Sequence, residues 1–101
     1  MGLFTLLFGN KTDKIKAFQN DGAIIIDVRT SSEFMQGAIA GSVNIPLQTI
    51  QSKIKDIQDY NKPVITCCAS GIRSANAASI LKTNGIEVMN GGGWVSLNNK
   101  L

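Results

Sequence analysis

The sequence has no histidine, and its only two cysteines, Cys67 and Cys68, are adjacent. Adjacent cysteines cannot build the framework of disulfides that holds many small secreted domains together. Without histidine and without a Cys-x-x-Cys spacing, the chain also lacks a ligand set typical of zinc, so no metal site is expected. Two reduced thiols fit a reducing compartment, and we therefore expect a cytoplasmic protein.

Strong charge and long apolar runs are also lacking. The formal net charge is +3 and the lysines are scattered rather than clustered, so nucleic acid is not an expected partner. The apolar segment MGLFTLLFGN, residues 1–10, is too short to span a bilayer. It also lacks the basic start and cleavage site of a signal peptide. We expect an N-terminal extension that packs on the domain as a strand or cap, in preference to membrane contact through residues 3–8.

The sequence does contain an alternation of strand and helix patterns, without repeats or linkers. Its length suits a single domain, 1–101. Continuous β-branched runs are typical of strands buried on both faces, and apolar residues spaced by three and four predict helices. This alternation predicts an α/β fold around a mostly parallel sheet, in which sites form at the carboxyl ends of the strands. We expect strands over residues 22–28, 41–47, 62–67 and 86–90, helices over 12–20, 31–37, 47–57 and 74–85, and a glycine-rich turn at 91–93 before a short last helix.

Small polar residues mark the expected helix starts. Thr12 is the expected N-cap of the first helix, and Ser31 or Ser32 that of the second. The helix that follows the two cysteines is expected to begin around Ser74.

The segment TCCASGIRSA, residues 66–75, runs from a predicted strand through a small-residue loop into that helix. Successive backbone N–H groups in such a loop form a nest for an anion, and the helix dipole adds positive potential. Arg73 contributes a guanidinium at the start of the helix. A cysteine at the base of this loop would have a stabilised thiolate and a lowered pKa, which is the condition for nucleophilic reactivity.

Two spacings are compatible with the loop. Counted from Cys68, the pattern is Cys-x4-Arg with Gly71 three residues after the cysteine. Counted from Cys67, it is Cys-x5-Arg followed by Ser74, which matches the spacing of cysteine phosphatases. A longer loop admits a phosphate and a shorter one suits a single sulfur atom, so the spacing alone leaves the choice open.

Three segments together resemble a single-domain rhodanese, a sulfurtransferase with a three-layer α/β fold. IIIDVRTSSEFMQGAIAGSVNIPL resembles the first signature of the family, and CASGIRSA resembles its active-site pattern Cys-x-x-Gly-x-Arg-Ser. NGGGWVSL resembles the closing Gly-Gly-x-x-x-Trp region, with a shorter spacing to Trp94. The resemblance implies transfer of a sulfane sulfur from polysulfide, persulfide or thiosulfate to a thiol, cyanide or protein acceptor, through a persulfide on the cysteine and without a cofactor.

Carried over residue by residue, the resemblance makes Cys68 the nucleophile and Cys67 the last residue of its strand, facing the other side of the sheet. Arg73 would assist catalysis. Asp27 would hydrogen-bond the turn that follows it, while Arg29 and Glu33 would pair with each other or brace the loop, as scaffold rather than as catalysts. The expected substrate-binding residues are Ala69, Ser70, Gly71, Ile72, Arg73 and Ser74.

The chain departs from the family pattern at three positions. Ala38 stands where the family commonly has histidine, and Ala69 and Ile72 replace polar or cationic loop residues. A loop whose only cation is Arg73 attracts the thiosulfate dianion weakly, which favours polysulfide or persulfide donors. The alternatives are a non-catalytic rhodanese-like module that binds a partner protein, and a cysteine phosphatase or arsenate reductase that uses Cys67.

Overall fold

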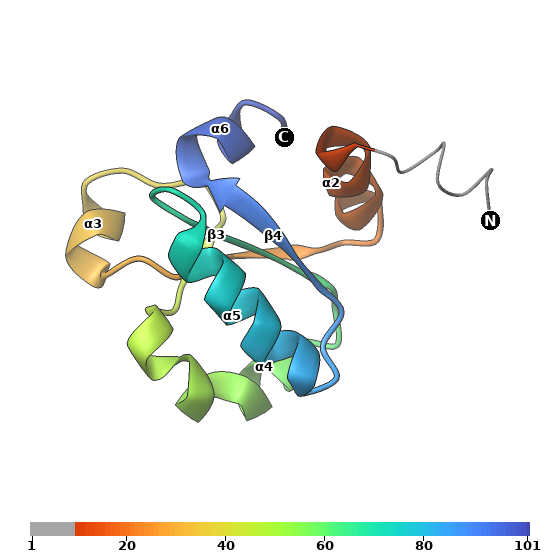
Figure 1. Cartoon of the computed structure of the whole chain (residues 1–101), viewed down its shortest axis with the longest axis vertical. Coiled ribbons are helices and arrows are strands. Elements are labelled where there is room, and N and C mark those ends of the chain that lie inside the picture. The colour runs from red at the N-terminus through yellow and green to blue at the C-terminus, as the bar shows by residue number, and fades with distance from the viewer. Residues whose placement is uncertain (1–9) are drawn as a thin grey trace.

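The computed structural model describes residues 10–101, in which helices and short strands alternate (Figure 1). The interpretations given to the apolar segment at residues 1–9 therefore lie outside the described residues. The elements are α2 (Lys11–Asn20), β1 (Ile24–Asp27), α3 (Ser31–Met35), β2 (Val43–Asn44), the 3-10 helix η1 (Leu47–Lys53), α4 (Ile54–Tyr60), β3 (Val64–Cys68), α5 (Ile72–Thr83), β4 (Val88–Gly93) and α6 (Trp94–Asn98).

All four strands pair in parallel, in the order β2-β1-β3-β4. This confirms the predicted α/β class with a parallel central sheet. Asp27 at the end of β1 pairs with Cys67, and Cys68 at the end of β3 pairs with Gly93 at the end of β4. The carboxyl ends of three strands therefore meet beside the loop that follows Cys68.

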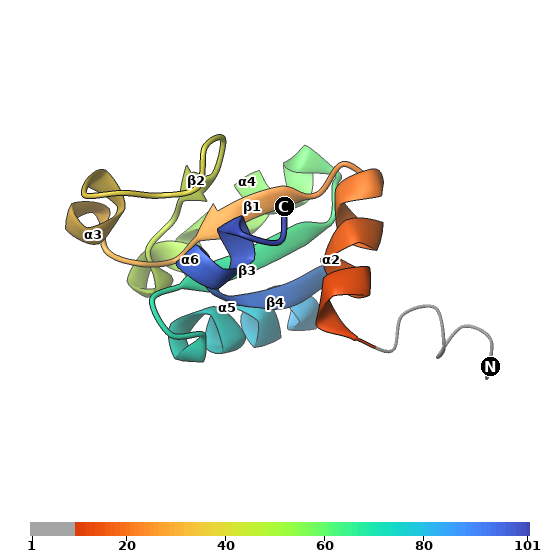
Figure 2. The ribbon, with the colours of Figure 1, turned by 90° about the horizontal axis from the view of Figure 1, so that it is seen from above.

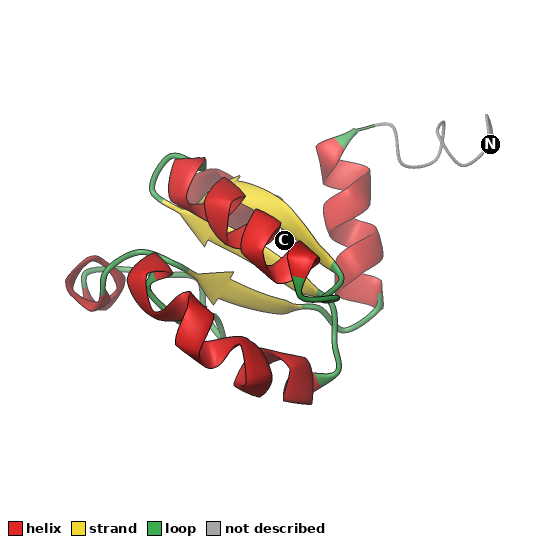
Figure 3. Ribbon diagram, turned by 60° about the horizontal axis from the view of Figure 1, so that its bottom comes forward, coloured by secondary structure: helices red, strands yellow, loops and turns green. Residues whose placement is uncertain are grey.

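Helices cover both faces of the sheet, which gives the three layers implied by the resemblance. In Figure 1, α2 and α6 lie above the strands and α5 with α4 lies below them, and Figures 2 and 3 show the same sandwich from two other directions. One apolar cluster joins β1 and β3 to η1, α4 and α5 and contains Cys68. The other joins β3 and β4 to α2 and α6 and contains Cys67. The prediction that the two cysteines face opposite sides of the sheet is confirmed.

The expected helix caps are wrong by one or two residues. Helix α2 is capped by Asn10, whose Oδ1 accepts the Asp13 N–H at 2.8 Å, and not by Thr12. Helix α3 is capped by Thr30 rather than by Ser31 or Ser32. Thr30 and Glu33 form a reciprocal capping box, in which each side chain accepts the other residue's backbone N–H.

Several element boundaries also differ from the expectation. The helix expected over residues 47–57 is a 3-10 helix followed by α4, although its predicted core residues Ile50 and Ile57 are buried. Helix α5 begins at Ile72, two residues before Ser74. Strand β3 includes Cys68, so Cys67 is not its last residue. Residues 91–93, expected to form a turn, belong to β4 and lead directly into α6.

Two further observations concern the part of the chain that the structure describes. None of the helices within residues 10–101 combines the length and the apolar character needed to cross a bilayer. The same residues contain no group of three or more cysteine, aspartate or glutamate side chains placed to hold a metal ion.

Candidate active site

Cys68 lies at the carboxyl end of β3, at the base of a loop formed by residues 69–71. Its thiol sulfur accepts the backbone N–H of Gly71 at 3.0 Å and that of Ser74 at 3.4 Å. The chain can turn back over the sulfur because Gly71 adopts φ +102°, a left-handed conformation that suits glycine. The loop therefore points amide hydrogens at one sulfur atom, as the sequence predicted.

The surroundings of Cys68 lower the pKa of its thiol. Cys68 is fully buried, and burial alone would raise this pKa. Hydrogen bonds outweigh the burial: the Ser74 hydroxyl lies 3.3 Å from Sγ, and the backbone N–H groups of Ser74, Gly71 and Ser70 also stabilise the thiolate. The result is a pKa below the ordinary value for cysteine, which favours the thiolate as a nucleophile.

Cys67 has the opposite environment. Its side chain is buried in the apolar cluster beneath α2 and α6. Burial, with a smaller contribution from the nearby Asp27 carboxylate, raises the pKa of the Cys67 thiol to about 12. A thiol with this pKa is almost entirely protonated at neutral pH, so the geometry favours the Cys68 spacing over the phosphatase-like spacing from Cys67.

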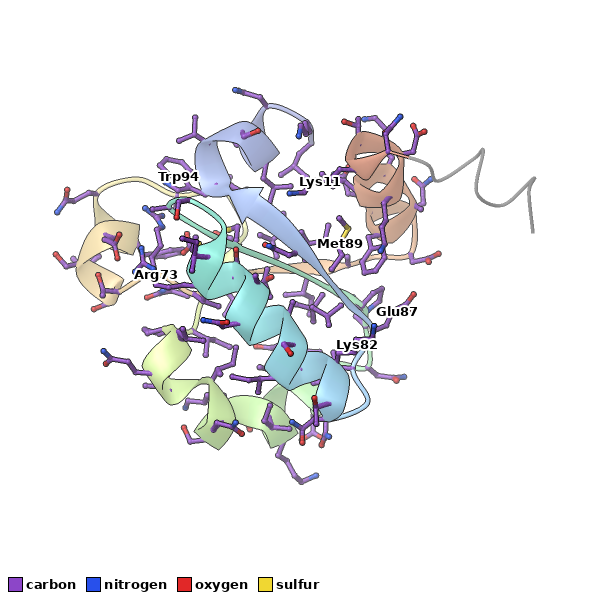
Figure 4. All side chains as sticks on the ribbon, in the orientation of Figure 1. Lys11, Arg73, Lys82, Glu87, Met89 and Trp94 are labelled. Atoms are coloured by element: carbon purple, nitrogen blue, oxygen red, sulfur yellow. The ribbon has the colours of Figure 1, made fainter. Side chains whose placement is uncertain are left out.

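The Arg73 guanidinium is paired with the carboxylate of Glu33. Its two terminal nitrogens donate to the two carboxylate oxygens of Glu33, at 2.8 and 3.0 Å. Figure 4 shows Arg73 reaching from the start of α5 toward α3. This bidentate pair links the loop to α3, and it lowers the pKa of Glu33 to about 2, with help from the Thr30 backbone N–H.

The Glu33–Arg73 pair predicts a dependence of stability on acid pH. Because the pKa of Glu33 falls from 4.5 to about 2 on folding, its contribution is complete above pH 4.5 and is lost as the pH drops toward 2. We expect Glu33→Gln to lower the thermal midpoint at pH 6 and to match the wild type near pH 2. Glu87→Gln, which changes an exposed carboxylate without an ion pair among residues 10–101, is the control. A constant difference between wild type and Glu33→Gln at every pH would contradict this.

Asp27 and Arg29 form a buried pair with each other, so the expected side-chain pairing of Arg29 with Glu33 is not formed. Arg29 donates from Nε and Nη2 to the Asp27 carboxylate at distances of 2.7 to 3.0 Å, and only 4% of Arg29 is exposed. Its Nη2 also donates to the Gly37 carbonyl at 2.8 Å, and its guanidinium lies 4.7 Å from the centre of the Trp94 ring. Asp27 also accepts the Arg29 backbone N–H at 3.0 Å, as predicted. Arg29 therefore connects β1, the segment after α3, and α6.

The remaining loop residues lie at the mouth of the site. Ala69 and Ser70 are exposed, and Ile72 is 72% exposed. Ser74 is fully buried beside Cys68. Within residues 69–74, Arg73 carries the single cationic side chain, and Glu33 neutralises it.

Sequence reasoning missed Asn90 and the structural role of the glycines after it. A Cβ atom on Gly93 would lie 2.9 Å from the Ala69 carbonyl oxygen, and one on Gly71 would lie 3.3 Å from the Gly92 Cα. The loop therefore packs directly on the backbone of β4. The Asn90 side chain bonds both Ser74 and the Gly71 carbonyl. A polar residue just before a glycine run, at the end of a strand beside β3, is the signal that would have found it.

The close packing at Gly71 leads to a second prediction. Gly71→Ala forces a left-handed alanine against Gly92 and shifts the N–H that bonds Cys68. We expect the free energy of unfolding to fall by about 1–3 kcal/mol and alkylation of Cys68 by iodoacetamide at neutral pH to slow by about tenfold, the equivalent of one pKa unit. Gly85→Ala, at φ +78° with nothing within 4 Å, carries similar strain and should leave alkylation unchanged. Equal alkylation rates in the two variants would show that the loop tolerates the change.

Comparisons with known proteins agree with this fold, which is that of the rhodanese-like class of three-layer α/β domains. The family model for the rhodanese-like domain matches residues 11–99, and the chain belongs to this family. Thiosulfate sulfurtransferase GlpE of Glaesserella parasuis is 33% identical over 82 residues, which cover 76% of this chain and 75% of that protein.

A second relative and a solved structure show the same likeness. The Bacillus subtilis protein YqhL is 41% identical over 63 residues, which cover 62% of this chain and 49% of YqhL, so the alignment spans about half the length of that relative. A rhodanese-like domain protein from Staphylococcus aureus superposes with a TM-score of 0.71 at 31% identity, with 86% of each chain covered.

Proposed function

We propose that this protein is a sulfurtransferase that carries a sulfane sulfur as a persulfide on Cys68. The observation that carries the proposal is the placement of the Cys68 sulfur beneath the N–H groups of Gly71 and Ser74, with a lowered thiol pKa. Related proteins that bear the name thiosulfate sulfurtransferase support the reaction class.

The reaction has two steps. The Cys68 thiolate attacks the sulfane sulfur of a donor, and a new S–S bond forms. The bond between that sulfur and the rest of the donor breaks, and its electron pair leaves with the rest of the donor. The negative charge of the resulting persulfide resides on its terminal sulfur, which the N–H groups of the loop over residues 69–74 stabilise. A thiol, cyanide or protein acceptor then attacks the terminal sulfur, and Cys68 leaves as a thiolate. Every step is a sulfur displacement, and none requires a cofactor or a metal.

In this proposal Arg73 acts through the loop. Its bidentate bond to Glu33 holds the first turn of α5 in position. The buried Asp27–Arg29 pair supports the same edge of the sheet from β1.

Two free thiols on a reduced chain are consistent with the cytoplasmic location inferred from the sequence.

The pairing of Arg73 with Glu33 leads to a prediction about the preferred sulfur donor. Thiosulfate is a dianion, and the site offers it one guanidinium already paired with Glu33. We expect kcat/KM for polysulfide or a small persulfide to exceed that for thiosulfate by at least about tenfold, which corresponds to 1.4 kcal/mol. Glu33→Gln, which frees the Arg73 charge, should shift the ratio toward thiosulfate. A ratio that favours thiosulfate in the wild type would contradict the prediction.

The proposal is tested by the intact mass of the reduced protein after incubation with polysulfide and, separately, with thiosulfate. A gain of one sulfur atom that a thiol or cyanide then removes is the expected result. No gain from either donor would overturn the proposal and favour the non-catalytic module that binds a partner protein.

A further inference from the structure

A hydrogen bond to Asn90 links the Ser74 hydroxyl to β4, and this hydroxyl lies within hydrogen-bond distance of two acceptors. Ser74 Oγ lies 2.7 Å from Asn90 Oδ1 and 3.3 Å from Cys68 Sγ. A hydroxyl has one proton to donate, so it cannot donate to Asn90 and to a Cys68 thiolate at the same time.

The orientation of the Asn90 amide is determined by backbone groups. The Gly92 N–H, which can only donate, lies 2.9 Å from Oδ1. The Gly71 carbonyl, which can only accept, lies 3.1 Å from Nδ2. A flipped amide would lose both bonds, so Oδ1 must face Ser74 and must accept its proton. Asn90 is therefore a fixed acceptor for the Ser74 hydroxyl.

We propose that Asn90 is a positioning residue that competes with Cys68 for the Ser74 hydroxyl proton and thereby sets how readily Cys68 ionises. With Cys68 protonated, its S–H donates to Ser74 Oγ and the hydroxyl donates to Asn90. When the thiol proton leaves to solvent, the hydroxyl turns to the thiolate, and Asn90 Oδ1 keeps only the Gly92 N–H. No proton is transferred between Cys68, Ser74 and Asn90; one hydrogen bond is exchanged for another.

The same exchange would run during sulfur transfer, and this part of the inference rests on the proposed function. When Cys68 becomes a persulfide, the charge moves from Sγ to the terminal sulfur, and the hydroxyl returns to Asn90. When the acceptor removes that sulfur, the charge returns to Sγ and the hydroxyl turns back. Asn90 thus favours the states in which Sγ is uncharged.

The other charged and titratable groups around Cys68 are the same in the wild type and in the Asn90 variants that test the proposal. They are Arg73 of α5 with its partner Glu33 of α3, the Asp27–Arg29 pair of β1, the neighbouring thiol of Cys67, and Lys11 of α2, whose ammonium lies against Gly92. A change in the pKa of Cys68 in an Asn90 variant therefore comes either from the Ser74 hydroxyl or from the loop. Release of the hydroxyl lowers this pKa, whereas loosening of the loop raises it.

The experiment measures the pKa of Cys68 from the pH dependence of iodoacetamide alkylation, followed by intact mass in a Cys67→Ala background. It needs no sulfur transfer, so it stands even if the proposed function fails. We expect Asn90→Ala to lower the pKa by roughly half to one unit, because the hydroxyl is released to the thiolate. In a Ser74→Ala background, Asn90→Ala should not lower the pKa, because the hydroxyl is absent.

A role for Asn90 in loop packing alone predicts the opposite result. Losing the bond to the Gly71 carbonyl would loosen the loop amides and raise the pKa with or without Ser74. That outcome, or no change, would overturn the proposal. If Asn90→Ala does not fold, Asn90→Asp replaces it in the same experiment. Asn90→Asp should then raise the pKa of Cys68 more in the presence of Ser74 than in the Ser74→Ala background. An equal rise in the two backgrounds would overturn the proposal. Asn98→Ala, an exposed asparagine of α6, is the matched control.

Discussion

Cys68→Ser is expected to abolish sulfur uptake from every donor. The side chains are nearly the same size, so the loop and its hydrogen bonds to Gly71 and Ser74 should remain. A serine hydroxyl is a far weaker nucleophile than a thiolate, and no histidine in the chain can activate it as a base. Intact mass after incubation with polysulfide should show no added sulfur, which is a loss of at least about a thousandfold in rate, or roughly 4 kcal/mol of barrier.

Cys67→Ala is the matched control for this experiment. Because the Cys67 thiol is buried on the opposite face with a pKa of about 12, its removal should leave uptake within about threefold of the wild type. Uptake that persists in Cys68→Ser and disappears in Cys67→Ala would assign the nucleophile to Cys67. It would also restore the phosphatase-like spacing as the relevant one.

Breaking the Asp27–Arg29 pair is expected to have the largest effect on stability. Asp27 is fully buried, and Asp27→Asn leaves the Arg29 guanidinium buried without its counter-charge. Removing one partner of a buried ion pair typically costs about 3–5 kcal/mol. Since a small domain has only about 5–15 kcal/mol of stability in total, the variant should be marginally folded at 37 °C. The midpoint of urea unfolding measures this directly.

The exposed pair between Lys55 and Asp59 provides the comparison. Its atoms are 3.4 Å apart, and 84% and 64% of the two side chains are exposed. Asp59→Asn should lower the free energy of unfolding by less than about 1 kcal/mol, because water screens the pair. If Asp27→Asn costs no more than Asp59→Asn, the buried pair is not what connects β1 to α6 and to the segment after α3.

The sequence predicted the two central strands well because their signal is local. The β-branched run at residues 24–26 and the run at residues 64–66 lie in the two central strands, β1 and β3. Helix caps were predicted less well because several polar residues compete at each start. Thr30, Ser31 and Ser32 are all good caps, and only Thr30 has Glu33 at the position that completes a capping box.

The geometry of the candidate site was predictable around Cys68 and Gly71, but its ion pairs were not. The loop sequence itself indicated a sulfur beneath backbone amides, and the structure agrees. Which carboxylate pairs with Arg73 depends on how α3 and α5 approach each other, across 40 residues of sequence. The partner of Asn90 depends in the same way on the position of β4, so the sequence could mark a polar residue ahead of a glycine run but not its bond to Ser74.

Helix α3 has five residues and buries none of them. It is held by its capping box, by the Glu33–Arg73 pair and by the weak bond from Arg29 to the Glu33 carbonyl at 3.4 Å, and these contacts are polar. Segments with little buried apolar surface open at a small fraction of the global unfolding free energy. Hydrogen exchange should therefore find α3 to be a separate, weakly protected unit beside Cys68. This side of the candidate site can then adjust while the loop over residues 69–71 stays packed on β4.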